Sequence, residues 1–159
     1  MKNNSNIEFG KRENIFEVEE GYTFSPKFDD DGLIPVVTTS QSGEVLMHGY
    51  MNSEALKLTL ENKEAYYWSR SRNCLWHKGI TSGLTQKVIS LRVDDDQDTI
   101  WLIVNVLGAG ASCHVGYRSC FYRSVELDEK GKLKIKFEET EKLFDPDLVY
   151  KGQVNPTKL

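Results

Sequence analysis

Two cysteines close together in the chain constrain its fold more than any other feature. They bound the segment 113–120, which reads CHVGYRSC. Thiolate groups bind zinc well, and two sulfurs on one zinc ion lie only about 3.8 Å apart. Seven residues of helix would separate the Cα atoms of Cys113 and Cys120 by about 10.5 Å, and a strand would separate them further. To share an ion the segment must double back, and Gly116 can take a positive-φ turn without steric cost.

Two thiolates do not complete a tetrahedral zinc site. Another side chain and a water molecule would have to join Cys113 and Cys120, and such an open position is typical of catalytic rather than structural zinc. The spacing alone leaves a second interpretation, in which both cysteines are small buried core residues.

An acidic run lies between two strand-like runs, 86–93 and 99–106, and it comprises Asp94, Asp95, Asp96, Gln97 and Asp98. Carboxylates suit magnesium or calcium better than zinc. In an extended chain Asp94, Asp96 and Asp98 would face one side and Asp95 the other. Because four residues of strand span about 13 Å, three aspartates could share one cation only if the chain curls at Gln97. The alternative is a solvated hairpin turn.

The hydrophobic pattern predicts an α+β fold dominated by strands, in a single domain of residues 1–159 with a loose N-terminal tail, 1–12, and a C-terminal strand and tail, 125–159. A helix is expected from Ser53 to Asn62. The expected strands are 34–39, 44–48, 65–69, 86–93, 99–106, 120–127 and 132–137.

Composition excludes several classes of protein. The net charge of −4 and the lack of a basic stripe argue against nucleic-acid binding. Three cysteines, an odd number, favour a reducing compartment over a disulfide framework. No signal-peptide core or membrane-length apolar stretch occurs, so we expect a cytoplasmic protein without membrane contact.

Several motifs occur in a fixed order along the chain: Leu33-Ile34-Pro35, Val45-Leu46-Met47, Tyr50-Met51-Asn52, Trp68-Ser69-Arg70-Ser71-Arg72, Leu75-Trp76-His77-Lys78-Gly79, Thr81-Ser82-Gly83, Gln86-Lys87-Val88, the aspartate run, and Cys113-His114 with Gly116 and Ser119-Cys120-Phe121-Tyr122-Arg123. In this order they resemble the phosphoribosyl-AMP cyclohydrolase family of histidine biosynthesis. The resemblance covers about residues 28–124.

The resemblance implies a barrel-like, intertwined homodimer that opens the adenine ring of 1-(5-phosphoribosyl)-AMP between N1 and C6. Zinc and magnesium are the implied cofactors. By resemblance, Cys113 and Cys120 bind zinc, and His114 shuttles a proton, a role that its ordinary pKa near about 6.5 allows. The implied magnesium ligands are Asp94, Asp96 and Asp98.

One position departs from the family in a way that affects the metal site. The family usually has a third zinc-binding cysteine, contributed across the dimer interface, where this chain has Asp95. A carboxylate can bind zinc, although it is a harder ligand than a thiolate. Asp95 can therefore replace the cysteine, another group or water can fill its place, or the zinc site can be weakened or absent. Ile80 and Leu84 also differ from the family.

Substrate contacts follow from the charge of a nucleotide with two phosphate groups. Arg70, Arg72 and Lys78 are suited to bind phosphate. Further candidates for substrate binding are the hydroxyl residues and tryptophans of the same segment: Trp68, Ser69, Ser71, Trp76, Thr81 and Ser82. Each tryptophan can equally be a core residue.

Two rival functions stay open. The chain can be a related zinc amidohydrolase that acts on another purine-like nucleotide, as the substitutions at Asp95, Ile80 and Leu84 allow. It can also be a binding paralogue without catalysis, although such a protein would have no need to keep Cys113, His114 and Cys120 together.

Overall fold

A computed structural model describes residues 6–155 of the chain; residues 1–5 of the expected N-terminal tail and 156–159 of the C-terminal tail lie outside them. The elements follow in the order α1 (Ile15–Glu19), β1 (Leu33–Thr39), β2 (Val45–Asn52), α2 (Ser53–Asn62), β3 (Tyr66–Ser69), β4 (Cys74–His77), β5 (Gln86–Val93), β6 (Ile100–Val106), β7 (Arg123–Leu127), β8 (Leu133–Phe137) and α3 (Pro146–Val149). The protein is a strand-rich α+β domain, as predicted.

The main sheet is mixed, with strand order β2-β1-β6-β5. Strand β1 is antiparallel to β2 and parallel to β6, while β5 and β6 form an antiparallel hairpin. Pro35 is tolerated in this central strand because the pairing with β6 begins only at Val36. Strands β3 and β4 form a small separate sheet, and so do β7 and β8.

The expected barrel-like shape is wrong for the single chain. Strands β2 and β5 remain as the two edges of the main sheet, so no closed barrel forms among residues 6–155. The physical reason is that the main sheet has only four strands, whereas small closed barrels use about five to eight.

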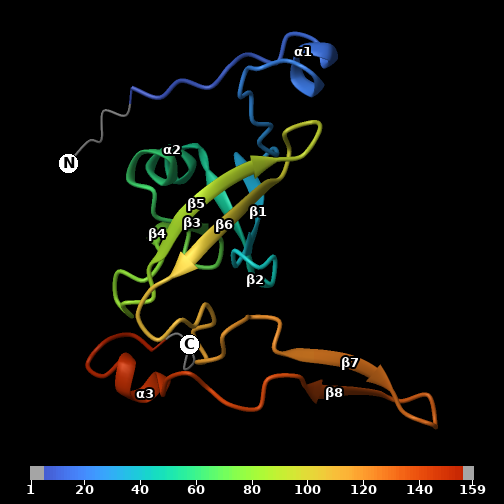
Figure 1. The fold of residues 1–159 in the computed structure, drawn as a ribbon, viewed down its shortest axis with the longest axis vertical. Helices are drawn as coiled ribbons and strands as arrows, with labels where there is room; N and C mark the ends of the chain where they lie inside the picture. The colour runs from blue at the N-terminus through green and yellow to red at the C-terminus, as the bar shows by residue number, and fades with distance from the viewer. Residues whose placement is uncertain (1–5, 156–159) are drawn as a thin grey trace.

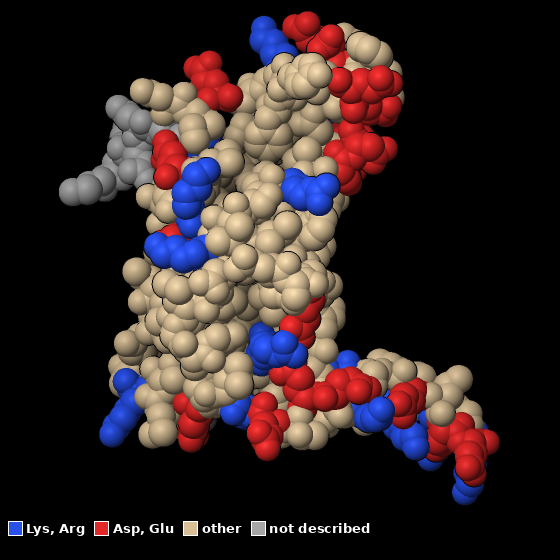
Figure 2. All heavy atoms as spheres, viewed as in Figure 1, with Lys and Arg blue, Asp and Glu red and all other residues tan. Residues whose placement is uncertain are grey.

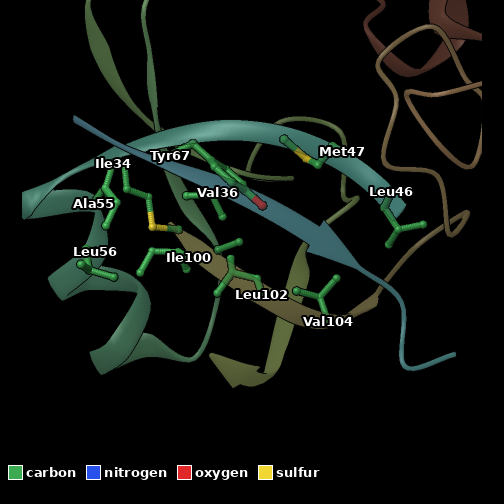
Figure 3. Packing of buried hydrophobic residues seen from close by; sticks show 12 residues of the cluster. Ile34, Val36, Leu46, Met47, Ala55, Leu56, Tyr67, Ile100, Leu102 and Val104 are labelled. Carbon is green, nitrogen blue, oxygen red and sulfur yellow. The ribbon is translucent and has the colours of Figure 1, made fainter. Parts of the chain in front are cut away.

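One hydrophobic core holds the main sheet, β3 and α2 together (Figure 3). Ile34 and Val36 of β1, Ile100 of β6 and Leu56 of α2 are fully buried in it. Helix α2 begins where the Asn52 side chain accepts a hydrogen bond of 2.8 Å from the backbone N–H of Ala55. It ends at Lys63, which has a left-handed φ of 55°. The core thus fixes the strands whose ends carry the candidate site.

The two motif segments lie at opposite ends of the long axis (Figure 1). The turn between β5 and β6 is at one end, near α1, and the segment between β6 and β7 is at the other, near α3. Asp and Glu side chains gather at the end formed by α1 and the β5–β6 turn (Figure 2). None of the helices within residues 6–155 combines the length and apolar character that a membrane crossing requires.

Candidate active site

The cysteine segment doubles back as its spacing predicts. Ser112 N–H donates to the carbonyl of Arg118 at 2.9 Å, and Cys113 N–H donates to the carbonyl of Tyr117 at 3.2 Å. Gly116 stands at the bend with a positive φ of 109°. These bonds bring the Cys113 and Cys120 side chains into direct contact.

Strand β2 anchors the returning arm of this loop. The backbone N–H of Cys120 donates to the carbonyl of Leu46 at 2.7 Å, and the Ser119 hydroxyl donates to the carbonyl of Val45 at 2.8 Å. Ser119 is buried, so its hydroxyl satisfies a buried backbone acceptor. The geometry of the loop therefore depends on the edge strand β2 of the main sheet.

The two thiol groups share one proton. The Cys120 thiol hydrogen-bonds to the Cys113 sulfur, and this bond, with backbone N–H groups and the Lys78 ammonium, lowers the pKa of Cys113 to about 6. The negative Cys113 sulfur in turn raises the pKa of Cys120. The pair therefore carries its charge on the buried Cys113 at neutral pH, and a thiolate is the form that binds a metal.

Lys78 is a buried cation beside this pair, with only 4% of its surface exposed. Its ammonium donates a hydrogen bond of 2.6 Å to the carbonyl oxygen of Ser112. Burial lowers the pKa of Lys78, while the charges of Cys120 and Cys113 oppose that shift. Lys78 thus offsets negative charge on the sulfurs in addition to bordering the cavity.

A buried network of hydrogen bonds connects the start of the cysteine loop to the core. Thr38 Oγ1 lies 2.7 Å from the Tyr67 hydroxyl, which donates to Gln86 Oε1 at 2.7 Å. Gln86 Nε2 then donates to the Ser112 hydroxyl at 3.2 Å. All four residues are buried, so these bonds fix the start of the loop relative to β1, β3 and β5.

A cavity of about 480 Å³ adjoins this loop and gathers most of the predicted substrate-binding residues. Its predicted members are Ser69, Ser71, Arg72, Trp76, Lys78, Thr81, Ser82 and His114. Exposed Ile80 also lines it, whereas Leu84 is buried elsewhere. Trp68 and Arg70 are not brought into it; they line a separate hollow with Asp31 and Asn52. The alternation of side chains along β3 separates Trp68 from Ser69, whereas Arg70 follows the end of the strand.

Two aromatic and cationic features shape the cavity. The Arg72 guanidinium lies 5.5 Å and the Lys78 ammonium 5.1 Å from the centre of the Trp76 ring. His114 is exposed, and the partial burial of its ring, together with the Lys78 charge, lowers its pKa. His114 is therefore neutral at neutral pH and able to accept a proton.

The acidic run curls at Gln97, as expected if its carboxylates are to meet. Gln97 has a positive φ of 57°. One oxygen each of Asp94, Asp95 and Asp96 lie within 4.8 Å of one another. The expectation that Asp95 faces away from its neighbours is wrong, because β5 ends at Val93 and the aspartates are in a turn rather than a strand.

Asp98 lies beside this group and interacts with Asp94 and Asp96. Asp94 Oδ1 accepts backbone N–H bonds from Asp98 and Thr99, both at 3.0 Å. Burial and the neighbouring Asp94 and Asp96 raise the pKa of the Asp98 carboxyl, while the hydrogen bond with Thr99 opposes that shift. The Lys27 ammonium lies 3.8 Å from Asp96 and 4.0 Å from Asp98.

The N-terminal segment holds the acidic turn from outside. The Gln97 side chain accepts from the N–H of Ser25 at 2.7 Å and donates to the carbonyl of Val18 at 2.9 Å. Arg12 donates to the carbonyls of Ser25 and Asp96. Within the expected loose tail, residues near Arg12 therefore contact the body of the protein.

The thiol pair and the aspartates are too far apart in one chain to share an ion. Ser112 contacts Gln86 at the start of β5, whereas Asp94 follows Val93 at its end. Eight residues of strand span roughly 25 Å, about ten times a zinc–ligand distance.

Sequence reasoning missed three contributors to the site. Gln86 belongs to one of the ordered motifs but was given no role, although a polar residue at the start of an apolar strand is a signal for a buried hydrogen bond. Tyr150 and Val154 line the cavity from the far C-terminus, where no pattern marks them.

Comparison with known proteins identifies the family. The family model described as Phosphoribosyl-AMP cyclohydrolase matches residues 47–122. A Phosphoribosyl-AMP cyclohydrolase of Bradyrhizobium diazoefficiens is 52% identical over 136 residues, which are 85% of this chain and 95% of the relative. The chain belongs to the phosphoribosyl-AMP cyclohydrolase family. Similar relatives of the same name come from Rhodopseudomonas palustris, 52% identical over 85% of this chain and 92% of the relative, and from Sinorhizobium fredii, 51% identical over 84% of this chain and 88% of the relative.

This member of the cyclohydrolase family is an enzyme, as the motif order predicted. The matched residues 47–122 include the cysteine loop, the aspartates and the cavity segment 69–82. They do not include Tyr150 and Val154 of the cavity wall.

Proposed function

We propose that this enzyme hydrolyses the adenine ring of 1-(5-phosphoribosyl)-AMP between N1 and C6, the ring-opening step of histidine biosynthesis. The observation that carries the proposal is the cavity beside the thiol pair, which unites a neutral histidine, two cations and several hydroxyl groups. The family names of the relatives agree with this reaction.

Cys113 and Cys120 are the residues that would hold zinc. Their side chains touch, one of them is ionised at neutral pH, and Lys78 offsets part of the charge. This donor set fits zinc, which prefers thiolate ligands. When bound, zinc supplies Lewis acidity that makes a water molecule a stronger nucleophile near neutral pH.

His114 would move the proton in this reaction. Its lowered pKa keeps the imidazole neutral, so it can accept a proton from the attacking water and return it to N1 of the opened ring. His114 follows Cys113 directly in the chain and lines the cavity, which supports this role beside both the thiol pair and the substrate.

The substrate phosphates would bind to the cationic residues of the cavity, Arg72 and Lys78. Arg72 is exposed there and can form a bidentate contact, and Ser69, Ser71, Thr81 and Ser82 offer hydroxyl donors. Trp76, with two cations near its ring, supplies a flat apolar wall suited to a purine. Lys78 contributes charge from its buried position.

Asp94, Asp95 and Asp96 offer an oxygen cluster, and Asp98 lies next to it. Carboxylates in such a turn fit magnesium, which prefers oxygen ligands. We assign Asp94, Asp96 and Asp98 to magnesium and Asp95 to the zinc of a partner subunit.

A homodimer follows from this assignment. Asp95 cannot reach the thiol pair of its own chain across the length of β5. The β7–β8 hairpin also presents one apolar face, where Val125 pairs with Ile135 and Leu127 pairs with Leu133, and these side chains are 51–75% exposed. A two-stranded hairpin is marginally stable alone, so a second subunit against this face would stabilise it.

The test is incubation of the purified protein with 1-(5-phosphoribosyl)-AMP while the ring-opened formimino product is followed. We expect turnover that a strong chelator abolishes and added zinc restores. Turnover of other purine nucleotides in preference to this substrate would favour a related amidohydrolase. No turnover of any nucleotide by protein with full zinc content would overturn the proposed reaction.

A further inference from the structure

The C-terminal segment crosses the cysteine loop and fixes its position against the bend. Leu143 N–H donates to the carbonyl of Gly116 at 2.8 Å, and the Lys142 ammonium lies 5.7 Å from the centre of the Tyr117 ring. A Cβ atom at Gly116 would meet the Phe144 carbonyl oxygen at 2.5 Å. The chain therefore passes over the bend in close contact and turns back toward the cavity through α3.

Tyr150 directly follows α3, and it lines the cavity. It is 8% exposed, and its ring packs edge-on against Phe144 with 6.4 Å between the ring centres. The short α3 begins at Asp145, whose side chain accepts a hydrogen bond of 2.9 Å from the N–H of Asp147. Two independent anchors, the Phe144 contact and the capped turn, thus hold the ring in place.

Tyr150 lines the cavity together with several serine and threonine side chains. Tyr150, Ser82, Lys78 and His114 line the same space, and the Ser82 side chain is close enough to lower the pKa of the phenol. Burial raises the pKa of Tyr150, so the phenol remains a donor at neutral pH. The oxygens of a phosphate group accept hydrogen bonds, and a buried donor that lines the cavity with a serine hydroxyl complements them.

We propose that Tyr150 is a substrate-binding residue, whose phenol, together with the Ser82 hydroxyl, binds a phosphate group of the nucleotide. The inference rests on the proposed function for the identity of the substrate. It adds to the site a residue outside the segment that the family model matches.

Tyr150→Phe tests the contact because it removes the hydroxyl and keeps the ring. We expect the KM for 1-(5-phosphoribosyl)-AMP and the Kd for AMP to rise roughly ten- to hundredfold, the range for losing a hydrogen bond to a charged group. The Kd for adenosine, which has no phosphate, should change less than twofold. Tyr22→Phe is the matched control, since Tyr22 is fully exposed and does not line this cavity.

Zinc content and the midpoint of thermal unfolding should match the wild type in both variants, which separates a lost contact from a damaged fold. Unchanged KM and AMP affinity in Tyr150→Phe would overturn the inference. An equal loss of adenosine affinity would also overturn it, because the phenol would then act on the nucleoside. Wild-type protein that binds AMP but turns over no 1-(5-phosphoribosyl)-AMP would refute the proposed reaction, while the AMP affinities would still decide the role of Tyr150. Wild-type protein that shows neither binding nor turnover would refute both.

Discussion

The Lys78 ammonium donates a 2.6 Å hydrogen bond to the carbonyl oxygen of Ser112, the residue that precedes Cys113. This bond fixes a buried positive charge at the start of the cysteine loop. It links β4, which ends at His77, to the loop that follows β6. The charge and the position of the thiol pair therefore depend on a residue more than thirty positions away in the chain.

Lys78→Met should reduce the reactivity of Cys113 in metal-free protein. Loss of the cation removes one of the causes that lower the Cys113 pKa to about 6, so less thiolate is present at pH 6 to 7. When the alkylation rate is plotted against pH, the midpoint of the curve should lie at a higher pH than in the wild type. The measurement uses a Cys74→Ser background, because Cys74 is an exposed free cysteine.

Lys130→Met is the control for this experiment, because Lys130 is exposed in the β7–β8 turn. It should leave the midpoint unchanged. Equal midpoints in Lys78→Met and wild type would show that the thiolate is stabilised by Cys120 and backbone N–H groups alone.

Cys113→Ser and Cys120→Ser should each remove bound zinc and activity together. A serine hydroxyl is a much poorer zinc ligand than a thiolate. Cys74→Ser should retain both properties, because Cys74 is on β4 and does not contact the pair. Metal analysis of the three purified variants decides the point, and full zinc in either loop variant would contradict the assignment.

His114→Asn should lower kcat by roughly 10²- to 10⁴-fold, or about 3 to 5 kcal/mol of barrier, the usual loss when a general acid–base group is removed. Zinc should remain bound. His48→Asn is the control, because His48 lies on β2 against Tyr50 and does not line the cavity. An unchanged kcat in His114→Asn would exclude the proton-shuttle role.

Gly116→Ala should destabilise the protein by about 3 kcal/mol or more, because a side chain at φ 109° is strained and its Cβ would meet the Phe144 carbonyl at 2.5 Å. Gly131→Ala has a positive φ of 73° but open space around it, so it should cost only about 1 to 2 kcal/mol. Urea unfolding measures both. Equal losses would mean that the C-terminal segment moves aside freely.

Local patterns predicted two of the long elements well, whereas β2 extends to Asn52, four residues beyond the predicted end at His48. The helix Ser53–Asn62 and the strand Gln86–Val93 agree with prediction to the residue, because each has a clear apolar period and a defined start. The expected strand 120–127 begins later, at Arg123, because Cys120 is bound to β2 instead. Strand β4, with four residues, was missed because its pairing with β3 is a tertiary contact that composition does not mark.

Only those parts of the site could be predicted whose geometry depends on residues close together in the chain. The loop around Gly116 and the curl at Gln97 followed from bond geometry and metal-ligand distances. The alternation argument for Asp95 failed because it assumed that the strand continues past Val93. Tyr150 reaches the cavity because it packs against Phe144, in the segment that contacts the cysteine loop, and such long-range contacts cannot be read from spacing.

Asp95→Ala should lower zinc affinity and activity if its carboxylate completes the site of a partner subunit, and Asp95→Cys should retain or tighten zinc because a thiolate is the softer ligand.

The separation along β5 adds a sharper test by mixing two inactive proteins. In a heterodimer of Asp95→Ala and Cys113→Ser subunits, one site has lost both groups and the other has kept both. Random exchange should therefore restore about a quarter of wild-type activity. Mixing Asp95→Ala with itself is the control and should restore none. Failure of the mixed pair after demonstrated subunit exchange would show that the two groups do not act across a dimer, and full zinc and activity in Asp95→Ala would show that Asp95 is not a ligand.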